Sequence, residues 1–168
     1  MLDIYFRRPV FWDYFISTIL IICVVVLNMK GFLIIPKESI YISIISDISS
    51  IGLTSAGFIL TLLTVLITFK SGSKLTKEEY ENAKSVFELF FISDLYFETV
   101  KHLKNCIKSL IIISIFGYVL KLGLSPEYRY LIYFSNYLGL TIIILTLWRC
   151  LLILSKILSM QKQQISDT

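Results

Sequence analysis

Four long blocks of apolar residues constrain this chain more than any other feature of its sequence. A helix needs about 20 consecutive, mostly apolar residues to cross the hydrocarbon core of a bilayer. Blocks of that length fit at about residues 12–32, 42–69, 106–124 and 130–150, and they take up more than half of the 168 residues. We therefore predict an all-α integral membrane protein: a single membrane domain, residues 1–168, with four transmembrane helices arranged as two hairpins.

The longest segment between these blocks, residues 70–105, predicts a helical arm and not a separate soluble domain. Thr76 with Glu79 three residues later forms a capping box, so a helix is expected to begin there. Aromatic residues share one side of this helix: Tyr80, Phe87, Phe90 and Phe91. An amphipathic helix of this kind lies on a membrane surface or packs against a partner. A second helix is expected from Leu95 into the third block, and the polar residues 160–168 are expected to form a frayed tail.

The distribution of lysine and arginine predicts the orientation of the chain. If the N-terminus is inside, the inner segments hold twelve of these residues: Arg7, Arg8, Lys70, Lys74, Lys77, Lys84, Lys101, Lys104, Lys108, Arg149, Lys156 and Lys162. The outer segments then hold four: Lys30, Lys37, Lys121 and Arg129. Because short segments rich in these residues stay inside, we predict a multi-pass protein of the inner (plasma) membrane with both termini and the arm in the cytoplasm.

Small and hydroxyl residues form a regular stripe along the second block. Their spacings are 4, 3, 4, 3, 4, 3 and 4, over Ser43, Asp47, Ser50, Thr54, Gly57, Thr61, Thr64 and Thr68. A 3.5-residue period keeps such a stripe facing one partner helix. The stripe is either a packing seam, in which small residues let helices approach, or the lining of a water-filled path in an oligomer.

Asp47 is the most informative residue of this stripe. It lies 23 residues before Lys70, or about 35 Å along a helix, which places it at the outer interface. In an oligomer it would form an acidic ring that favours cations. The alternative is a solvated carboxylate with no role.

No pattern of residues in the sequence indicates catalysis. Clustered metal ligands, nucleophile motifs and phosphate-binding glycine loops are absent, so we expect no enzyme, no cofactor and no metal site. The segment from Lys70 to Lys108, which includes the arm, carries a net charge of only +1, which argues against nucleic acid as a partner. The cysteines Cys23, Cys106 and Cys150 are expected to be packing residues. Arg149 and Lys156 are expected to snorkel to anionic headgroups at the inner end of the fourth block.

In its hydropathy plan the chain resembles small multi-pass membrane proteins of bacterial anti-phage defence operons, including membrane accessories of CRISPR systems. The resemblance covers the whole chain, as two helical hairpins joined by a cytoplasmic arm, and the phrase Thr54-Ser55-Ala56-Gly57-Phe58-Ile59-Leu60-Thr61 is similar in character to theirs. It carries no functional residue over. It implies an oligomer that permeabilises the inner membrane when a partner signals infection.

Two functions are compatible with these observations. In the leading hypothesis the chain is a homo-oligomeric membrane effector that forms a pore or perturbs the bilayer. The stripe of the second block then meets at the assembly axis, and the helix carrying Tyr80 and Phe91 receives the signal of a cytoplasmic protein. In the alternative, the four helices form a closed, non-conducting scaffold, and the arm recruits a cytoplasmic partner. A small transporter is disfavoured because the central portions of the blocks are continuous.

Overall fold

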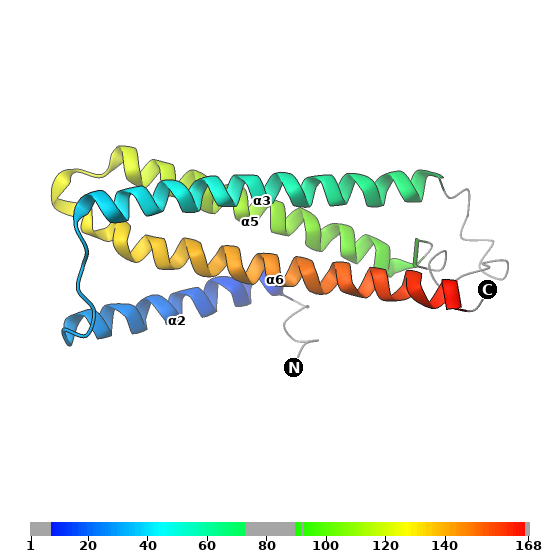
Figure 1. Ribbon diagram of the computed structural model, residues 1–168, viewed down its shortest axis with the longest axis horizontal. Coiled ribbons are helices and arrows are strands. Elements are labelled where there is room, and N and C mark those ends of the chain that lie inside the picture. The colour runs from blue at the N-terminus through cyan, green and yellow to red at the C-terminus, as the bar shows by residue number, and fades with distance from the viewer. Residues whose placement is uncertain (1–7, 73–89, 92, 167–168) are drawn as a thin grey trace.

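The computed structural model describes residues 8–72, 90–91 and 93–166, with side chains up to Ser159. Within these ranges the regular structure is entirely helical (Figure 1): α2 (Pro9–Met29), α3 (Glu38–Gly72), α5 (Asp94–Gly123), the short 3-10 helix η2 (Pro126–Tyr128) and α6 (Tyr130–Ser166). The four α-helices are each long and apolar enough to cross a membrane. The prediction of an all-helical chain with four candidate membrane spans is thereby confirmed.

The helices form an elongated bundle with two different halves (Figure 1). The long helices α3, α5 and α6 pack against one another, while α2 packs mainly against α6 and runs beside only part of it. We call the end with the connections 30–37 and 124–129 the loop end, and the end where α3 finishes and α5 begins the arm end. The loop half therefore contains four helices, and the arm half contains three.

The first two helices of the chain do not form a closely packed pair. They are connected through residues 30–37, yet α2 packs against α6 and α3 packs chiefly against α5. Figure 1 shows α6 lying between α2 and α3. The two-hairpin arrangement expected from the sequence therefore describes only the order of the helices along the chain. In space, α6 is the helix that packs both against α2 and against α3 and α5.

Local sequence explains most helix ends. Pro9 occupies the first turn of α2, where its missing N–H is not needed. After α2 the chain turns at Gly31, whose φ of 76° is readily adopted by glycine, and the Asn28 side chain donates to the Leu33 carbonyl at 2.8 Å. Ser93 in an extended conformation precedes α5, at the predicted break. The expected fraying from residue 160 is not observed in the backbone, since α6 continues to Ser166.

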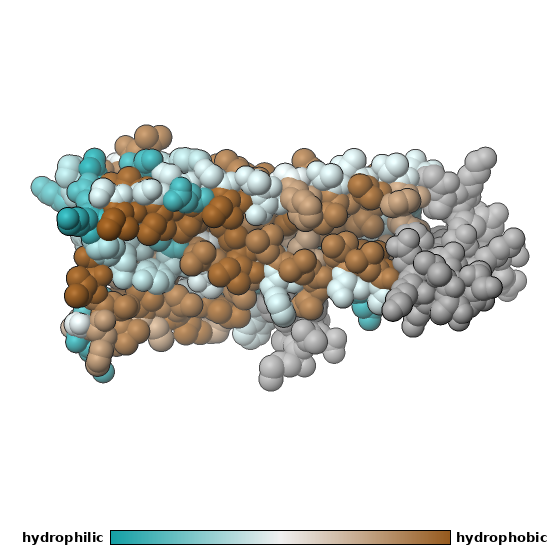
Figure 2. Space-filling model, in the orientation of Figure 1, coloured by the Kyte–Doolittle hydropathy of each residue, from teal (hydrophilic) through white to brown (hydrophobic). Residues whose placement is uncertain are grey.

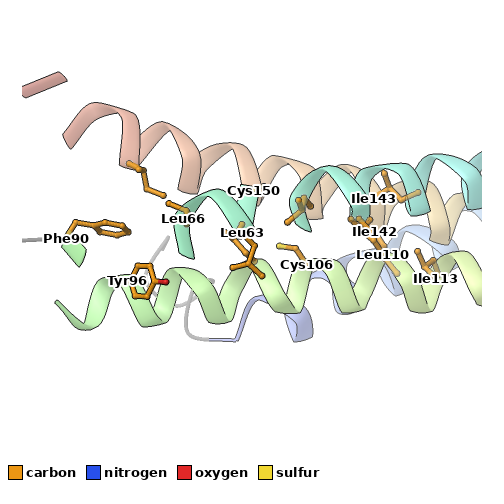
Figure 3. Packing of buried hydrophobic residues seen from close by; sticks show 14 of the residues in the cluster. Leu63, Leu66, Phe90, Tyr96, Cys106, Leu110, Ile113, Ile142, Ile143 and Cys150 are labelled. Carbon is orange, nitrogen blue, oxygen red and sulfur yellow. The ribbon is translucent and has the colours of Figure 1, made fainter. Parts of the chain in front are cut away.

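Glycine and serine allow α3 and α5 to pack at close range. A Cβ atom on Gly52 would collide with the Ser114 hydroxyl of α5, and one on Gly117 would collide with the Ser49 hydroxyl of α3. These two reciprocal pairs leave no space between the helix backbones. The bundle core continues toward the arm end as an apolar cluster from all three long helices, including Leu63, Leu110 and Ile142 (Figure 3).

Candidate functional site

The stripe of small and hydroxyl residues lies on the exposed side of α3. All eight members are exposed: Ser43, Asp47, Ser50, Thr54, Gly57, Thr61, Thr64 and Thr68. A different face of the same helix makes the contacts within the chain, through Tyr41, Ile45, Ile48, Ser49, Gly52, Ala56, Ile59, Leu63 and Leu66. Apart from one hydrogen bond made by Ser50 to α5, the stripe forms no seam inside this bundle. Its surface is available to lipid or to another molecule.

The threonine hydroxyls of this exposed face are hydrogen-bonded along their own helix. Thr54, Thr61, Thr64 and Thr68 each donate to the carbonyl four residues earlier, at 2.9 to 3.1 Å. The Ser50 hydroxyl pairs with the Tyr118 hydroxyl of α5 at 3.1 Å. Because the threonine hydroxyls already donate to backbone carbonyls, this face can leave water without exposing unsatisfied hydrogen-bond donors. Each hydroxyl oxygen keeps a lone pair that can accept a further hydrogen bond.

A buried ion pair joins α2 to α6 where the four-helix half meets the three-helix half. Arg149 Nη1 of α6 donates to Asp13 Oδ2 of α2 at 2.7 Å, and both side chains are 0% exposed. The other guanidinium nitrogens, Nε and Nη2, each lie 3.4 Å from the Cys106 sulfur of α5. The pair therefore connects three helices. A buried charge is tolerated only when it is paired and hydrogen-bonded.

This ion pair corrects the expectation for Arg149 from the sequence. Arg149 does not snorkel to headgroups, because its guanidinium is completely enclosed by protein and bound to Asp13. Asp13 is a site residue that the sequence patterns did not indicate. Cys106 accepts hydrogen bonds from the arginine and is also a packing residue. A signal was present in the sequence: an aspartate and an arginine lie at the same predicted depth in the first and fourth blocks, and opposite charges inside spans usually pair.

The attachment of α2 to the bundle depends unusually on polar groups. Its buried residues are Pro9, Asp13, Ser17 and Val24, and Ser17 itself donates to the Asp13 carbonyl at 2.7 Å. The remaining faces of α2 are apolar and exposed, as at Phe11, Phe15, Ile19, Ile22 and Val26. The apolar contacts of α2 come from Val24 and from the partly buried Tyr14 and Leu20. The Asp13–Arg149 pair is the principal specific contact between α2 and the other helices.

Of the four aromatic residues predicted to form one side of the arm helix, the two that the structure describes pack into the arm end of the bundle. Phe90 and Phe91 are 4% and 3% exposed and contact Tyr96, as Figure 3 shows for Phe90. Lys70 Nζ donates to the Phe91 carbonyl at 2.6 Å and lies 4.4 Å from the centre of the Tyr96 ring. These contacts fix the end of the arm to α3 and α5. The other two predicted arm residues, Tyr80 and Phe87, and the predicted capping box, lie outside the described residues.

The described side chains also bear on ligand chemistry. Within residues 8–72, 90–91 and 93–159, no three histidine, cysteine, aspartate or glutamate side chains lie close enough together to hold a metal ion. An apolar groove of about 190 Å³ lies between α3 and α6, lined by residues such as Val65, Phe69, Ile153 and Leu158.

The chain matches no protein-family model, no curated protein and no solved structure. Function must therefore be argued from the geometry of the bundle.

Proposed function

We propose that this chain is an oligomeric membrane effector whose copies meet through the exposed face of α3 and permeabilise the bilayer. One observation carries the proposal. The whole uncharged stripe from Ser50 to Thr68 is exposed, although the opposite face of the same helix is fully used inside the chain. Small residues and hydroxyls are the groups that membrane helices place at contacts with other helices. They are also groups that can line a hydrated path.

The interior of a single chain is an unsuitable route for ions. Between α3 and α5 the Gly52–Ser114 and Gly117–Ser49 contacts leave no room for water. Toward the arm end the core is the apolar cluster that includes Leu63 and Leu110. In this proposal the path therefore lies between copies, along the α3 faces. Asp47, exposed near the loop end, supplies the acidic ring.

The proposal includes an orientation in which the arm end faces the cytoplasm of a bacterial cell. The excess of lysine and arginine in the segments at that end supports it. We further propose that a cytoplasmic protein partner acts on the arm and triggers assembly. The packing of Phe90 and Phe91 into the bundle would transmit a change in the arm directly to α3 and α5.

Dye leakage from liposomes tests this function. The purified protein should release a small trapped dye, and Thr61→Leu combined with Thr64→Leu should slow the release because it removes two hydroxyls from the α3 face. The matched control is Ile112→Leu combined with Ile115→Leu, which alters exposed residues of α5 and should leave leakage unchanged. Asp47→Asn should reduce the preference for cations measured from the reversal potential in a planar bilayer.

Two results would count against the proposal. Equal leakage from the Thr61/Thr64 variant and the control would show that the α3 face does not contribute to the path. Tight vesicles at every protein density, with and without a cytoplasmic extract, would favour the alternative of a non-conducting scaffold. In that case Phe87→Asp should abolish recovery of a partner protein and leave the membrane potential unaffected.

A further inference from the structure

A cavity of about 180 Å³ lies at the loop end of the bundle, between α3, α6 and the connection that precedes α3. We call it the loop-end cavity. The apolar part of its wall comes from Ile44, Ile48 and Leu140, and the polar part comes from Tyr133, Asn136 and Tyr137. A wall of this kind suits an occupant that is apolar along one part and polar along another.

The loop end carries the charges expected at a membrane surface. Exposed Lys30, Lys37, Glu38 and Glu127 lie in or next to its two connections. Figure 2 shows hydrophilic surface gathered at this end, beside the apolar surface of the helices. Tyrosine is enriched where hydrocarbon meets headgroups, and tyrosines line the loop-end cavity. The cavity therefore lies at the depth of lipid headgroups and of the first part of their acyl chains.

Asn136 provides a buried hydrogen-bond acceptor that the bundle does not use. Its side chain is 6% exposed, and its Nδ2 donates to the Tyr41 carbonyl of α3 at 2.9 Å. Within the part of the chain that the structure describes, its Oδ1 accepts no hydrogen bond. Leaving a buried acceptor unpaired is unfavourable, and such atoms are normally paired with protein or with a bound molecule. An occupant of the loop-end cavity that donates a hydrogen bond would satisfy it.

The two tyrosines place a donor next to this acceptor. The hydroxyls of Tyr133 and Tyr137 are hydrogen-bonded to each other at 3.1 Å. That bond uses one of the two protons, so the other remains to be donated. The polar wall thus offers an acceptor and a donor within about one turn of α6. A hydroxyl group matches both because it donates and accepts, whereas an ammonium group only donates.

Arg129 adds a cationic donor beside the cavity. It lies one turn before Tyr133, and its Nη1 donates to Glu38, which follows Pro36 of the cavity wall by two residues. Its Nε is enclosed and has no acceptor among the described residues. Phosphate is a strong acceptor for a guanidinium. Arg129 precedes Asn136 by seven residues, so the cation lies about 10 Å nearer the membrane surface than the unused amide oxygen.

We infer that the loop-end cavity binds one lysophospholipid, which is a lipid with a phosphate, a free glycerol hydroxyl and a single acyl chain. The phosphate accepts from Arg129, and the hydroxyl pairs with Asn136 and the tyrosine donor. The acyl chain lies along the apolar part of the wall.

A lipid with two acyl chains does not fit this pattern of donors and acceptors. It has an ester in place of the free hydroxyl, and ester oxygens only accept. Hydroxyls of its headgroup lie on the far side of the phosphate from the acyl chains, away from Asn136. The inference does not depend on the pore proposed above.

Native mass spectrometry of the full chain in a maltoside detergent measures this binding. The probes are palmitoyl lysophosphatidylglycerol, its analogue without the hydroxyl next to the acyl ester, and dipalmitoyl phosphatidylglycerol. We expect the first to bind about tenfold more tightly than either of the others, because both leave the Asn136 oxygen unpaired. The detergent competes with all three probes alike, so the ratio of their affinities is the quantity compared.

Variants of the chain locate the bound lipid. Leu140→Trp fills the loop-end cavity and should abolish the preference for lysophosphatidylglycerol. The matched control Ile112→Trp changes an exposed apolar residue of α5 and should keep the preference. Arg129→Gln removes the cation and should weaken binding of lysophosphatidylglycerol about tenfold. Circular dichroism checks that each variant remains helical.

Three results would overturn the inference. Equal binding of the three probes by the native chain would show that the cavity selects only an apolar chain. An unchanged preference in Leu140→Trp would place the bound lipid elsewhere on the protein. Absence of any lipid adduct would leave water as the partner of Asn136. None of these measurements involves leakage, so each outcome leaves the proposed function to its own test.

Discussion

Replacing Asp13 by asparagine removes the carboxylate that binds Arg149 and leaves the shape of the side chain almost unchanged. In the native chain the two groups are 2.7 Å apart and both are 0% exposed. The guanidinium of the variant keeps its contacts with the Cys106 sulfur but loses its counter-charge in a site that water does not reach. Removing one partner of a buried pair costs about 3–5 kcal/mol. We therefore expect Asp13→Asn to lose that much stability.

The effect should be local at first, because α2 has few other specific contacts. The loss corresponds to a change of about 10² to 4 × 10³-fold in the ratio of attached to detached α2, at 1.4 kcal/mol per tenfold. The two tryptophans of the chain, Trp12 and Trp148, flank the two partners in sequence. Their fluorescence during an SDS titration in mixed micelles therefore reports detachment of α2, while circular dichroism reports loss of helix.

A double-mutant cycle decides whether the pair itself is responsible. Asp13→Leu combined with Arg149→Met replaces both charges by apolar groups, and it should recover most of the stability lost by either single change. If Asp13→Asn unfolds within about 1 kcal/mol of the native chain, the reasoning is refuted. The same holds if the losses of the two single variants simply add in the double variant, since independent sites behave in that way.

Three further substitutions test other contacts by SDS titration. Gly52→Ala places a Cβ against a serine hydroxyl of α5 and should destabilise the bundle by about 1–3 kcal/mol. The control Gly57→Ala meets open space and should be neutral or stabilising by up to about 1 kcal/mol. Equal effects of the two substitutions would contradict the close packing of α3 and α5. Lys70→Met removes a 2.6 Å bond to a carbonyl and a contact with an aromatic ring, and should cost about 1–3 kcal/mol, with earlier proteolysis near residue 90 as an independent measure. Glu38→Gln breaks the exposed pair with Arg129 and should change stability by less than about 1 kcal/mol at physiological salt; a larger loss would show that this pair is shielded from water.

The sequence alone was sufficient for the class of structure. A chain segment in lipid must satisfy its own backbone hydrogen bonds, so the length and hydropathy of a block predict a helix, and four helices long and apolar enough to span a membrane are present. The break before Asp94 and the turn at Pro126 were also readable, because serine and proline act on the backbone within a few residues. The period of the α3 stripe correctly indicated that its members share one side of the helix.

Which side of α3 faces the rest of the chain was decided only by the tertiary structure. Both faces of α3 repeat with a period near 3.5, so periodicity could not show that Gly52 and Leu63 face inward while Thr54 and Thr64 face outward. That choice depends on how closely glycine and serine let α5 approach. The sequence likewise did not determine the partner of α2: its connection along the chain favours α3, whereas the structure packs it against α6 through the Asp13–Arg149 pair.

The pairing of Asp13 with Arg149 illustrates the same limit most clearly. Each residue, taken alone, is a charge near the end of an apolar block, and a solvated or snorkelling side chain is the ordinary outcome. The two residues are separated by 136 positions in sequence, and no local pattern joins them. Only the packing of α2, α5 and α6 closes the site to water. Once water is excluded, each charge is stable only when it is paired with the opposite charge.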